Sequence, residues 1–218
     1  MPHLPLRLIK GYAAFKGGRL AEERARYREL AEAGQRPEIM VVSCCDSRCA
    51  PETIFDVGPG ELFVTRNVAN LVPPFAPDDV HHGTSAALEF AVTVLEVKHI
   101  VVLGHGRCGG VKAFLAGVAT PPPPEDFIGH WITLIEPARA RLACDDPDPN
   151  LDPETALERA NVCQSLDNLR TFPWIREREQ DGRLTLEGAW FDISTGELMA
   201  LDPESGRFQP VDEAAAAA

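Results

Sequence analysis

The chain has 218 residues, enough for one large domain with its own core, and its 33 acidic and 21 basic residues give a net charge of −12. This acidic balance argues against nucleic acid and anionic membranes as main partners, because both are bound through basic patches. No segment approaches the length of a membrane span, and the N-terminus lacks a continuous apolar signal region, so we expect a cytoplasmic protein.

The first part of the sequence predicts a helical arm followed by a buried strand. Residues 20–33 are rich in helix formers of mixed charge and end at Gly34, which predicts a surface helix within an N-terminal arm of about residues 1–34. Residues 38–43 are a short apolar run rich in valine. They predict a buried strand that delivers Cys44 at its carboxyl end.

The middle of the sequence continues this pattern. A second strand is predicted around residues 62–65, and residues 83–99 predict an apolar helix. The segment 99–110 predicts another buried strand that ends in a glycine-rich turn. Apolar strands with an intervening helix indicate a parallel sheet, in which sites form at the carboxyl ends of the strands.

The last third of the sequence predicts mainly helices. The proline run 121–124 predicts a loop, and a helical stretch is expected to begin near Glu125. Residues 145–153 predict a second loop. Residues 154–180 predict one or two helices interrupted at Pro173.

Residues 184–201 predict a closing antiparallel hairpin with its turn at residues 194–196. The predicted fold class is therefore α/β: a mostly parallel sheet flanked by helices, with a C-terminal helical stretch and closing strands. We find no repeat and no second domain, so we expect one domain over residues 1–218, with its core at about 35–201. The alanine tail 214–218 is expected to be frayed.

Two short turns carry residues that suit a metal ion. In a reducing compartment, six cysteines favour ligands, nucleophiles or small buried residues over disulfides. The C-x-D-S-R turn begins at Cys44, and the H-G-R-C turn runs from His105 to Cys108. Both follow buried strands of one predicted sheet, so we expect the three side chains to reach one ion. Two thiolates and one imidazole suit Zn²⁺ and leave a fourth position open, whereas the alternative is inert core thiols.

Asp46 and Arg48 lie directly behind the first predicted ligand. A zinc ion with an open position binds water and lowers its pKa to about 7, which supplies hydroxide for attack on an electrophilic carbon. Asp46 can orient this hydroxide by accepting its proton, or it can occupy the fourth position itself. Arg48 can hold the carboxylate bidentately, away from the metal. The alternative, a simple loop salt bridge, is weaker beside the charge of a zinc ion.

These motifs together resemble the β-class carbonic anhydrases. SCCDSRCAPE is similar to the C-x-D-S-R turn of that family, GELFVTRNVAN to its strand-to-loop signature, and GHGRCGG to its H-x-x-C turn. The C-terminal GAWFDISTGELMAL is similar to its closing strands. The resemblance covers about residues 35–201, with the motifs in the same order and spacing.

The resemblance implies reversible hydration of CO₂ to bicarbonate and a proton by zinc-bound hydroxide. It implies a zinc ion held by Cys44, His105 and Cys108, with Asp46 orienting the hydroxide while paired with Arg48. It also implies a homodimer, often doubled to a homotetramer, in which the N-terminal helices wrap the partner subunit.

The resemblance further implies substrate-binding residues, some of them acting across the dimer interface. Gln35 would donate a hydrogen bond to substrate or bicarbonate, and an apolar CO₂ pocket would be formed by Phe63, Val68 and Phe90. Gly109, together with its neighbour Gly110, would allow the backbone to approach the metal-bound species. For the three apolar residues the alternative is core packing. A tyrosine is common in the family where this chain has Phe90.

A second departure concerns the state of the site. Family members that close the site with an aspartate ligand, and bind bicarbonate at a regulatory pocket, tend to carry tryptophan where this chain has Val41. Arg66, another residue of that pocket, is present. We therefore expect the open form at neutral pH, with Asp46 on Arg48 and not on zinc.

The other thiols and histidines are interpreted more simply. The non-ligand cysteines are expected to be Cys45, Cys49, Cys144 and Cys163. His81 and His82 are expected to be solvated loop residues, although they could relay protons.

Three other functions remain open from the sequence alone. The same zinc site could hydrolyse a CO₂-like substrate such as carbonyl sulfide or carbon disulfide. The chain could be a non-catalytic, zinc-stabilised binding protein in which Asp46 permanently closes the site. A thiol redox protein that uses Cys44 and Cys45 ranks last, because vicinal cysteines form strained disulfides.

Overall fold

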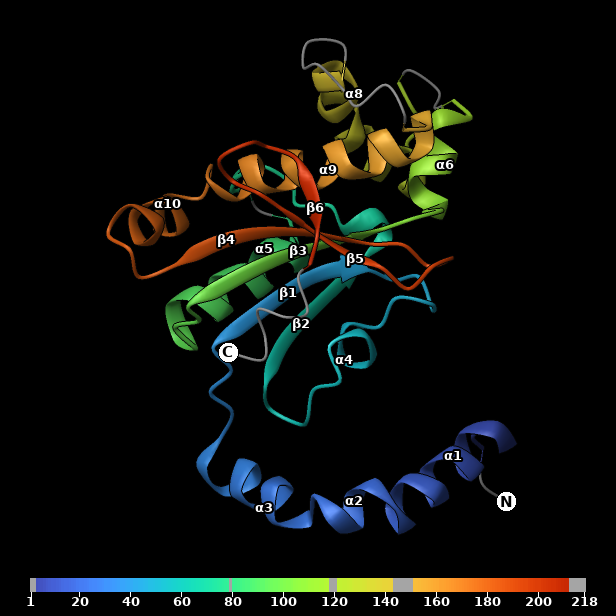
Figure 1. Ribbon diagram of the computed structural model, residues 1–218, viewed down its shortest axis with the longest axis vertical. Coiled ribbons are helices and arrows are strands. Elements are labelled where there is room, and N and C mark those ends of the chain that lie inside the picture. Colours follow the sequence, from blue (N-terminus) through green and yellow to red (C-terminus); the bar gives the residue numbers. More distant parts are fainter. Residues whose placement is uncertain (1–2, 79, 118–120, 143–150, 212–218) are drawn as a thin grey trace.

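The protein is built around one six-stranded sheet, with helices packed on it and a helical arm at one end (Figure 1). This computed structural model describes four stretches of the chain, residues 3–78, 80–117, 121–142 and 151–211. Two sequence expectations fall wholly or largely outside the described residues, namely the alanine tail 214–218 and the loop 145–153.

The structure contains the following strands and α-helices, each numbered in chain order. The strands are β1 Ile39–Cys44, β2 Leu62–Asn67, β3 His99–His105, β4 Thr185–Phe191, β5 Leu198–Leu201 and β6 Phe208–Pro210. The α-helices are α1 Leu6–Gly17, α2 Arg19–Glu22, α3 Arg24–Ala33, α4 Pro51–Ile54, α5 Gly83–Glu89, α6 Gly109–Leu115, α7 Phe127–Ile132, α8 Glu136–Leu142, α9 Pro153–Leu169 and α10 Pro173–Gln180. Among the described residues, no helix combines the length and apolarity needed to cross a membrane.

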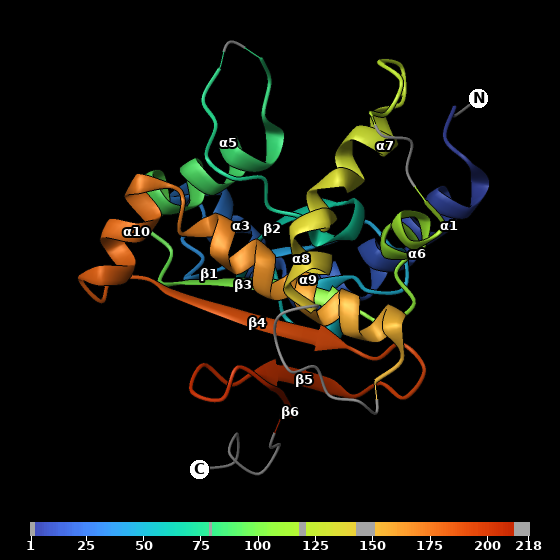
Figure 2. The ribbon, with the colours of Figure 1, turned by 90° about the horizontal axis from the view of Figure 1, so that it is seen from above.

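The sheet has the strand order β2-β1-β3-β4-β5-β6. Strands β2, β1, β3 and β4 run parallel, whereas β5 and β6 are antiparallel to their neighbours. Figure 2 shows β5 and β6 continuing the sheet beyond β4. The predicted fold class, a mostly parallel sheet with helices and closing strands, is confirmed. The predicted hairpin is β4–β5, and β6 is an additional strand that the sequence analysis did not identify.

The core lies mainly between the sheet and the helices on one face. Met40 and Val102 point from adjacent strands into the same apolar cluster as Leu88 of α5 and Val162 of α9. These strands are apolar on both faces, as expected for the centre of a parallel sheet, and Val41 packs into a smaller cluster on the opposite face. Burial on both faces fixes the strand register, and therefore the level at which each strand ends.

The helix predicted over residues 83–99 is shorter than expected. Helix α5 ends at Glu89 and continues as a π-helical turn over Phe90–Val94. The chain then reverses at Glu96, whose φ of 55° lies in the left-handed region, before β3 begins. The predicted end of this helix was therefore wrong, because an apolar pattern does not distinguish helix from a turn followed by a buried strand.

The N-terminal arm consists of α1, α2 and α3 and lies apart from the sheet (Figure 1). None of these three helices buries a residue in this chain. The surface helix predicted over residues 20–33 is divided at Glu23 between α2 and α3. The arm contacts the core at one loop, where the Arg19 guanidinium donates a 2.9 Å hydrogen bond to the Val57 carbonyl.

Candidate metal centre

Three ligand-type side chains meet at the carboxyl ends of β1 and β3. Cys44 is the last residue of β1, His105 is the last residue of β3, and Cys108 immediately precedes α6. One ligand atom from each lies within 4.8 Å of the other two, and all three residues are buried. Because β1 and β3 are adjacent parallel strands, their ends reach the same edge of the sheet. The structure thus brings together the three residues singled out in the sequence.

Hydrogen bonds orient two of these side chains for metal binding. The Nδ1 atom of His105 donates a 2.9 Å hydrogen bond to the Gly106 carbonyl, which leaves Nε2 as the ring atom that can face a metal ion. This Nε2 atom is buried and has no hydrogen-bond partner among the described residues. The Cys44 sulfur accepts a 3.3 Å hydrogen bond from the Ala69 amide. A buried nitrogen without a partner beside two thiols fits a tetrahedral Zn²⁺ site.

The protonation states of the two thiols are linked. A hydrogen bond from the Cys108 thiol lowers the pKa of Cys44 to about 4, and the same interaction raises the pKa of Cys108. Burial lowers the pKa of His105, but its contacts with the thiols of Cys44 and Cys49 outweigh this and raise it to about 10. Cys44 is therefore the more acidic thiol of the pair, and a divalent cation would displace the protons of the group.

Asp46 and Arg48 form a tight pair beside this group. The Arg48 Nε and Nη2 atoms donate hydrogen bonds of 2.9 and 2.7 Å to the two carboxylate oxygens of Asp46. The Arg48 amide also donates to Asp46 Oδ1, and Nη2 donates to the Arg107 carbonyl. The Arg48 guanidinium holds the pKa of Asp46 well below its usual range. The carboxylate therefore lies on Arg48, in the arrangement expected for an open site.

Arg66 supports the loop that carries these residues. Its Nε atom donates a 2.8 Å hydrogen bond to the Cys44 carbonyl, and its Nη2 atom donates a 2.7 Å bond to the Asp46 carbonyl. The family resemblance implied Arg66 only as part of a regulatory bicarbonate pocket. In this chain its guanidinium instead fixes the backbone on both sides of Cys45.

The predicted substrate residues divide into two groups in this chain. Val68 lies beside the metal centre, because a Cβ atom added at Gly110 would come within 2.9 Å of its side chain. A Cβ atom added at Gly109 would meet nothing within 4 Å. Gly110 therefore packs closely against the residues that follow β2, whereas the approach of the Gly109 backbone to a metal-bound species stays a prediction.

Phe63, Phe90 and Gln35 lie away from the three ligands. In the sheet register Phe63 is opposite Met40, four residues or about 13 Å along β1 from Cys44. The rings of Phe63 and Phe90 are 5.8 Å apart, and Phe90 is partly exposed. Gln35 is exposed and precedes the amino end of β1. A single chain does not bring these residues to the metal centre.

The remaining cysteines and histidines do not join the ligand group. Cys45 is exposed, Cys49 is buried near His105, and Cys163 is half-buried, while Cys144 lies outside the described residues. His81 and His82 are exposed, and the His82 ring lies 2.7 Å from an oxygen of Asp78.

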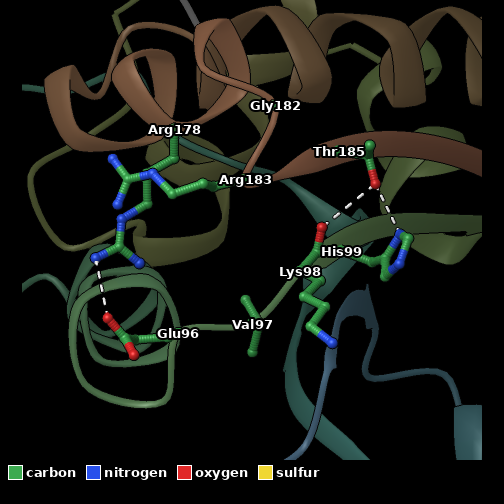
Figure 3. Close-up of a pocket in the computed structure, with 8 residues that line it drawn as sticks. All are labelled: Glu96, Val97, Lys98, His99, Arg178, Gly182, Arg183 and Thr185. Atoms are coloured by element: carbon green, nitrogen blue, oxygen red, sulfur yellow. Dashed lines mark hydrogen bonds and ion pairs between the residues drawn. The ribbon is translucent and has the colours of Figure 1, made fainter.

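A cavity of about 500 Å³ lies at the opposite edge of the sheet, near the amino ends of β3 and β4 (Figure 3). Its basic side chains face acidic partners: Arg178 lies 3.9 Å from Glu96, and Lys98 is bonded to Glu38. None of the three ligand-type residues lines this cavity. It is therefore separate from the metal centre.

Sequence reasoning missed one buried acid beside the centre. Glu158 of α9 accepts a 2.8 Å hydrogen bond from the Cys108 amide, and burial raises the pKa of Glu158 to about 7. An acidic residue between Leu157 and Ala160, both buried, is the only local signal of this role. Its partner lies 50 residues earlier in the sequence, so no spacing pattern connects them.

Comparisons with known proteins agree on one family. A family model described as carbonic anhydrase matches residues 39–198. The chain is 37% identical over 200 residues to beta carbonic anhydrase 3 of Arabidopsis thaliana, covering 90% of this chain and 77% of that protein. It is 34% identical over 183 residues to the chloroplastic beta carbonic anhydrase 5 of the same plant, covering 84% of this chain and 60% of that protein.

Solved structures give the same result. The beta-carbonic anhydrase CcaA superposes with a TM-score of 0.82 at 33% identity, over 95% of this chain and 92% of that one. A tetrameric beta-carbonic anhydrase of Sordaria macrospora superposes with a TM-score of 0.74 at 30% identity, over 93% and 97% of the two chains.

Proposed function

Because the chain belongs to the β class of carbonic anhydrases, we propose that its Cys44, His105 and Cys108 bind the catalytic zinc for the reversible hydration of CO₂ to bicarbonate and a proton. The observation that carries this proposal is the buried grouping of two thiols and an imidazole whose Nε2 atom has no described partner. The β-carbonic anhydrases are zinc enzymes, and this donor set matches the preference of Zn²⁺. When bound, zinc supplies a Lewis acid that allows water to ionise near neutral pH.

Asp46 and Arg48 have separate tasks in this proposal. One carboxylate oxygen of Asp46 accepts a hydrogen bond from the attacking water and so aims a lone pair of that water at the carbon of CO₂. Arg48 keeps the carboxylate in this position through two hydrogen bonds and prevents it from turning towards the metal. The low pKa of Asp46 supports this task, because the carboxylate stays ionised and can act only as a hydrogen-bond acceptor.

The substrate pocket requires a second copy of the chain in this proposal. Val68 and Gly109 come from the chain that holds the metal. Gln35, Phe63 and Phe90 lie at a distance from the ligands of their own chain, so we assign them to the site of a partner subunit. The partly exposed, apolar ring of Phe90 supports such a contact.

We propose a homodimer that can double to a homotetramer, with residues 1–34 as the association arm of one domain with its core at 35–201. A related structure from Sordaria macrospora is tetrameric. The arm presents Leu6, Leu8 and Tyr12, which are 65%, 58% and 61% exposed in the single chain. Apolar side chains on helices that bury nothing are suited to pack against another copy.

Placing two charges on the arm is expected to reduce the oligomer. In the variant Leu8→Glu/Tyr12→Glu, carboxylates would replace apolar side chains at the proposed interface, where burial of an unpaired charge is costly. Sedimentation velocity should show a smaller species than the wild type. The matched control Lys10→Glu changes an exposed polar residue of the same helix and should retain the wild-type assembly. An unchanged assembly for the double variant would refute the role of the arm.

The alternative functions are not favoured by the comparisons. The family model and the related proteins are carbonic anhydrases, which supports CO₂ hydration over hydrolysis of carbonyl sulfide or carbon disulfide. They also do not favour a non-catalytic binding protein or a thiol redox protein.

Metal analysis combined with a CO₂ hydration assay tests the proposal. We expect about one zinc ion per chain and rapid hydration from about pH 6.5 to about 9. Stoichiometric zinc without hydration would support a binding protein, and release of H₂S from carbonyl sulfide at a higher rate than hydration would support the hydrolase. Full activity in protein stripped of metal would refute every hypothesis in which zinc is required.

We also propose that the protein acts in the cytoplasm. The five described cysteines are free, as expected in a reducing compartment. Fractionation of cells that produce the tagged protein tests this. Enrichment in an organelle or secreted fraction would overturn it.

A further inference from the structure

Glu158 is a buried carboxylate that touches the metal centre from behind. It is only 2% exposed and lies on α9 among the apolar side chains that surround the ligand group. Its Oε1 atom accepts a 2.8 Å hydrogen bond from the Cys108 amide, and its Oε2 atom accepts a 3.1 Å bond from Trp190 Nε1. Both oxygens therefore face N–H donors, and a carboxyl group has the two acceptor oxygens that this arrangement needs.

These two bonds join three elements that are distant in the sequence. Glu158 comes from α9, Trp190 from β4, and Cys108 from the turn after β3. The Trp190 ring is held in turn by the Arg159 guanidinium, which stacks 4.5 Å from the ring centre. A Cβ atom added at Gly106 would come within 3.1 Å of the same ring. The turn is therefore packed against a fixed surface.

The turn itself is strained. Arg107, directly before the ligand Cys108, has a φ of 59°, in the left-handed region that a non-glycine residue rarely adopts. Such a conformation persists only where surrounding contacts determine it. The bond from the Cys108 amide to Glu158 is the contact that fixes the residue immediately after the strained one.

We propose that Glu158 is a positioning residue that, together with Trp190, holds the turn so that the Cys108 sulfur stays in the tetrahedral site. This inference rests on the zinc site proposed above. Glu158 does not touch substrate. It acts through the Cys108 amide, and it must be a carboxylate because the Trp190 N–H occupies its second oxygen.

Zinc affinity, measured by competition with a chromophoric chelator on the full-length protein, tests this inference. Changes to groups that orient metal ligands typically weaken metal binding by about 10–100-fold, and we expect a loss in this range for Glu158→Ala. The matched control is Ser165→Ala, which removes another buried polar group of α9 that bonds to residues 70 and 72. Its zinc affinity should equal that of the wild type.

A pair of conservative variants distinguishes positioning from general stability. In Glu158→Gln the amide oxygen can serve only one of the two donors, so we expect an intermediate loss of zinc affinity. Trp190→Phe removes the second donor but keeps an aromatic ring. In the double variant, the glutamine oxygen can accept the hydrogen bond of the Cys108 amide, and the glutamine NH₂ group no longer faces the indole N–H of Trp190. We therefore expect Glu158→Gln/Trp190→Phe to bind zinc more tightly than Glu158→Gln alone. The thiolate charge-transfer band of the Co²⁺-substituted proteins should follow the same order.

The outcomes separate this inference from the proposed function. If the wild type binds no zinc, the proposed function fails. If the wild type binds zinc but Glu158→Ala and Ser165→Ala bind it equally well, or if Trp190→Phe gives no rescue, only the positioning role is overturned. Should Glu158→Ala not fold, the glutamine variants decide the question by themselves.

Discussion

Replacing Cys44 by alanine is expected to abolish both zinc binding and CO₂ hydration. The change leaves one thiol and one imidazole, and two protein ligands do not form the three-ligand site of a catalytic zinc. We expect zinc affinity to fall by more than about 100-fold, beyond the loss usual for groups that only orient ligands. Metal content after dialysis and the initial rate of CO₂ hydration measure the two effects.

The neighbouring thiol supplies a control that differs by one position. Cys45 is exposed and is not part of the ligand group, so Cys45→Ala should retain both zinc and activity. The metal-free Cys44→Ala protein should also unfold at a lower temperature than the zinc-loaded wild type, because zinc binding contributes to folding. Retention of stoichiometric zinc by Cys44→Ala, or loss of zinc in Cys45→Ala, would show that the ligand is assigned to the wrong residue.

The parallel part of the sheet could be predicted because its signal is local. Strands β1 and β3 are continuous apolar runs that end in turn residues, and the helix between them implies that they are parallel. The antiparallel edge of the sheet has a weaker signal in the sequence. Strand β6 has only three residues, Phe208–Pro210, and includes a proline, so no apolar or alternating pattern identifies it.

The metal centre was predictable for the same local reason. The three ligand-type residues lie at or just after the ends of two strands, so knowledge of the strands and of their parallel direction is sufficient to bring them together. The supporting contacts were not predictable. Arg66 bonds to a carbonyl 22 residues away, and Glu158 to an amide 50 residues away. Such contacts depend on how α9 and β2 pack on the sheet, and no motif of a single sequence records them.

The substrate residues mark another limit of sequence reasoning. Motif position assigned Gln35, Phe63 and Phe90 to the site, but in one chain they lie towards the amino end of β1, while the ligands lie at its carboxyl end. The two ends of a six-residue strand are about 17 Å apart. Their participation therefore requires a second subunit, and a sequence does not contain the relative placement of two copies.

Replacing Asp46 by alanine is expected to leave zinc in place and to reduce turnover by about 100-fold or more, the loss typical when a reacting group is no longer oriented. The carboxylate is not one of the three grouped ligands, so metal content should not change. Arg48 lowers the pKa of Asp46, and the carboxylate therefore stays ionised above the usual carboxyl range. The stabilisation from this pair is lost only as the pH falls through that lowered pKa. Between about pH 6.5 and about 9, the pH profile of the wild type should thus not report Asp46.

Substitution of Arg48, the partner of Asp46, shows whether turnover depends on the orientation of the Asp46 carboxylate or on its charge. Without Arg48 the pKa of Asp46 would return towards its usual value, where it is still ionised at neutral pH, so a loss of turnover in Arg48→Ala would reflect a misplaced carboxylate. Because both residues act as one unit, the double variant should be hardly worse than Asp46→Ala. Glu52→Ala, which removes an exposed carboxylate from the adjacent α4, is the matched control and should keep full turnover. A fully active Asp46→Ala enzyme would show that the pair is only a loop salt bridge, and additive losses in the double variant would show that the two residues do not act as one unit.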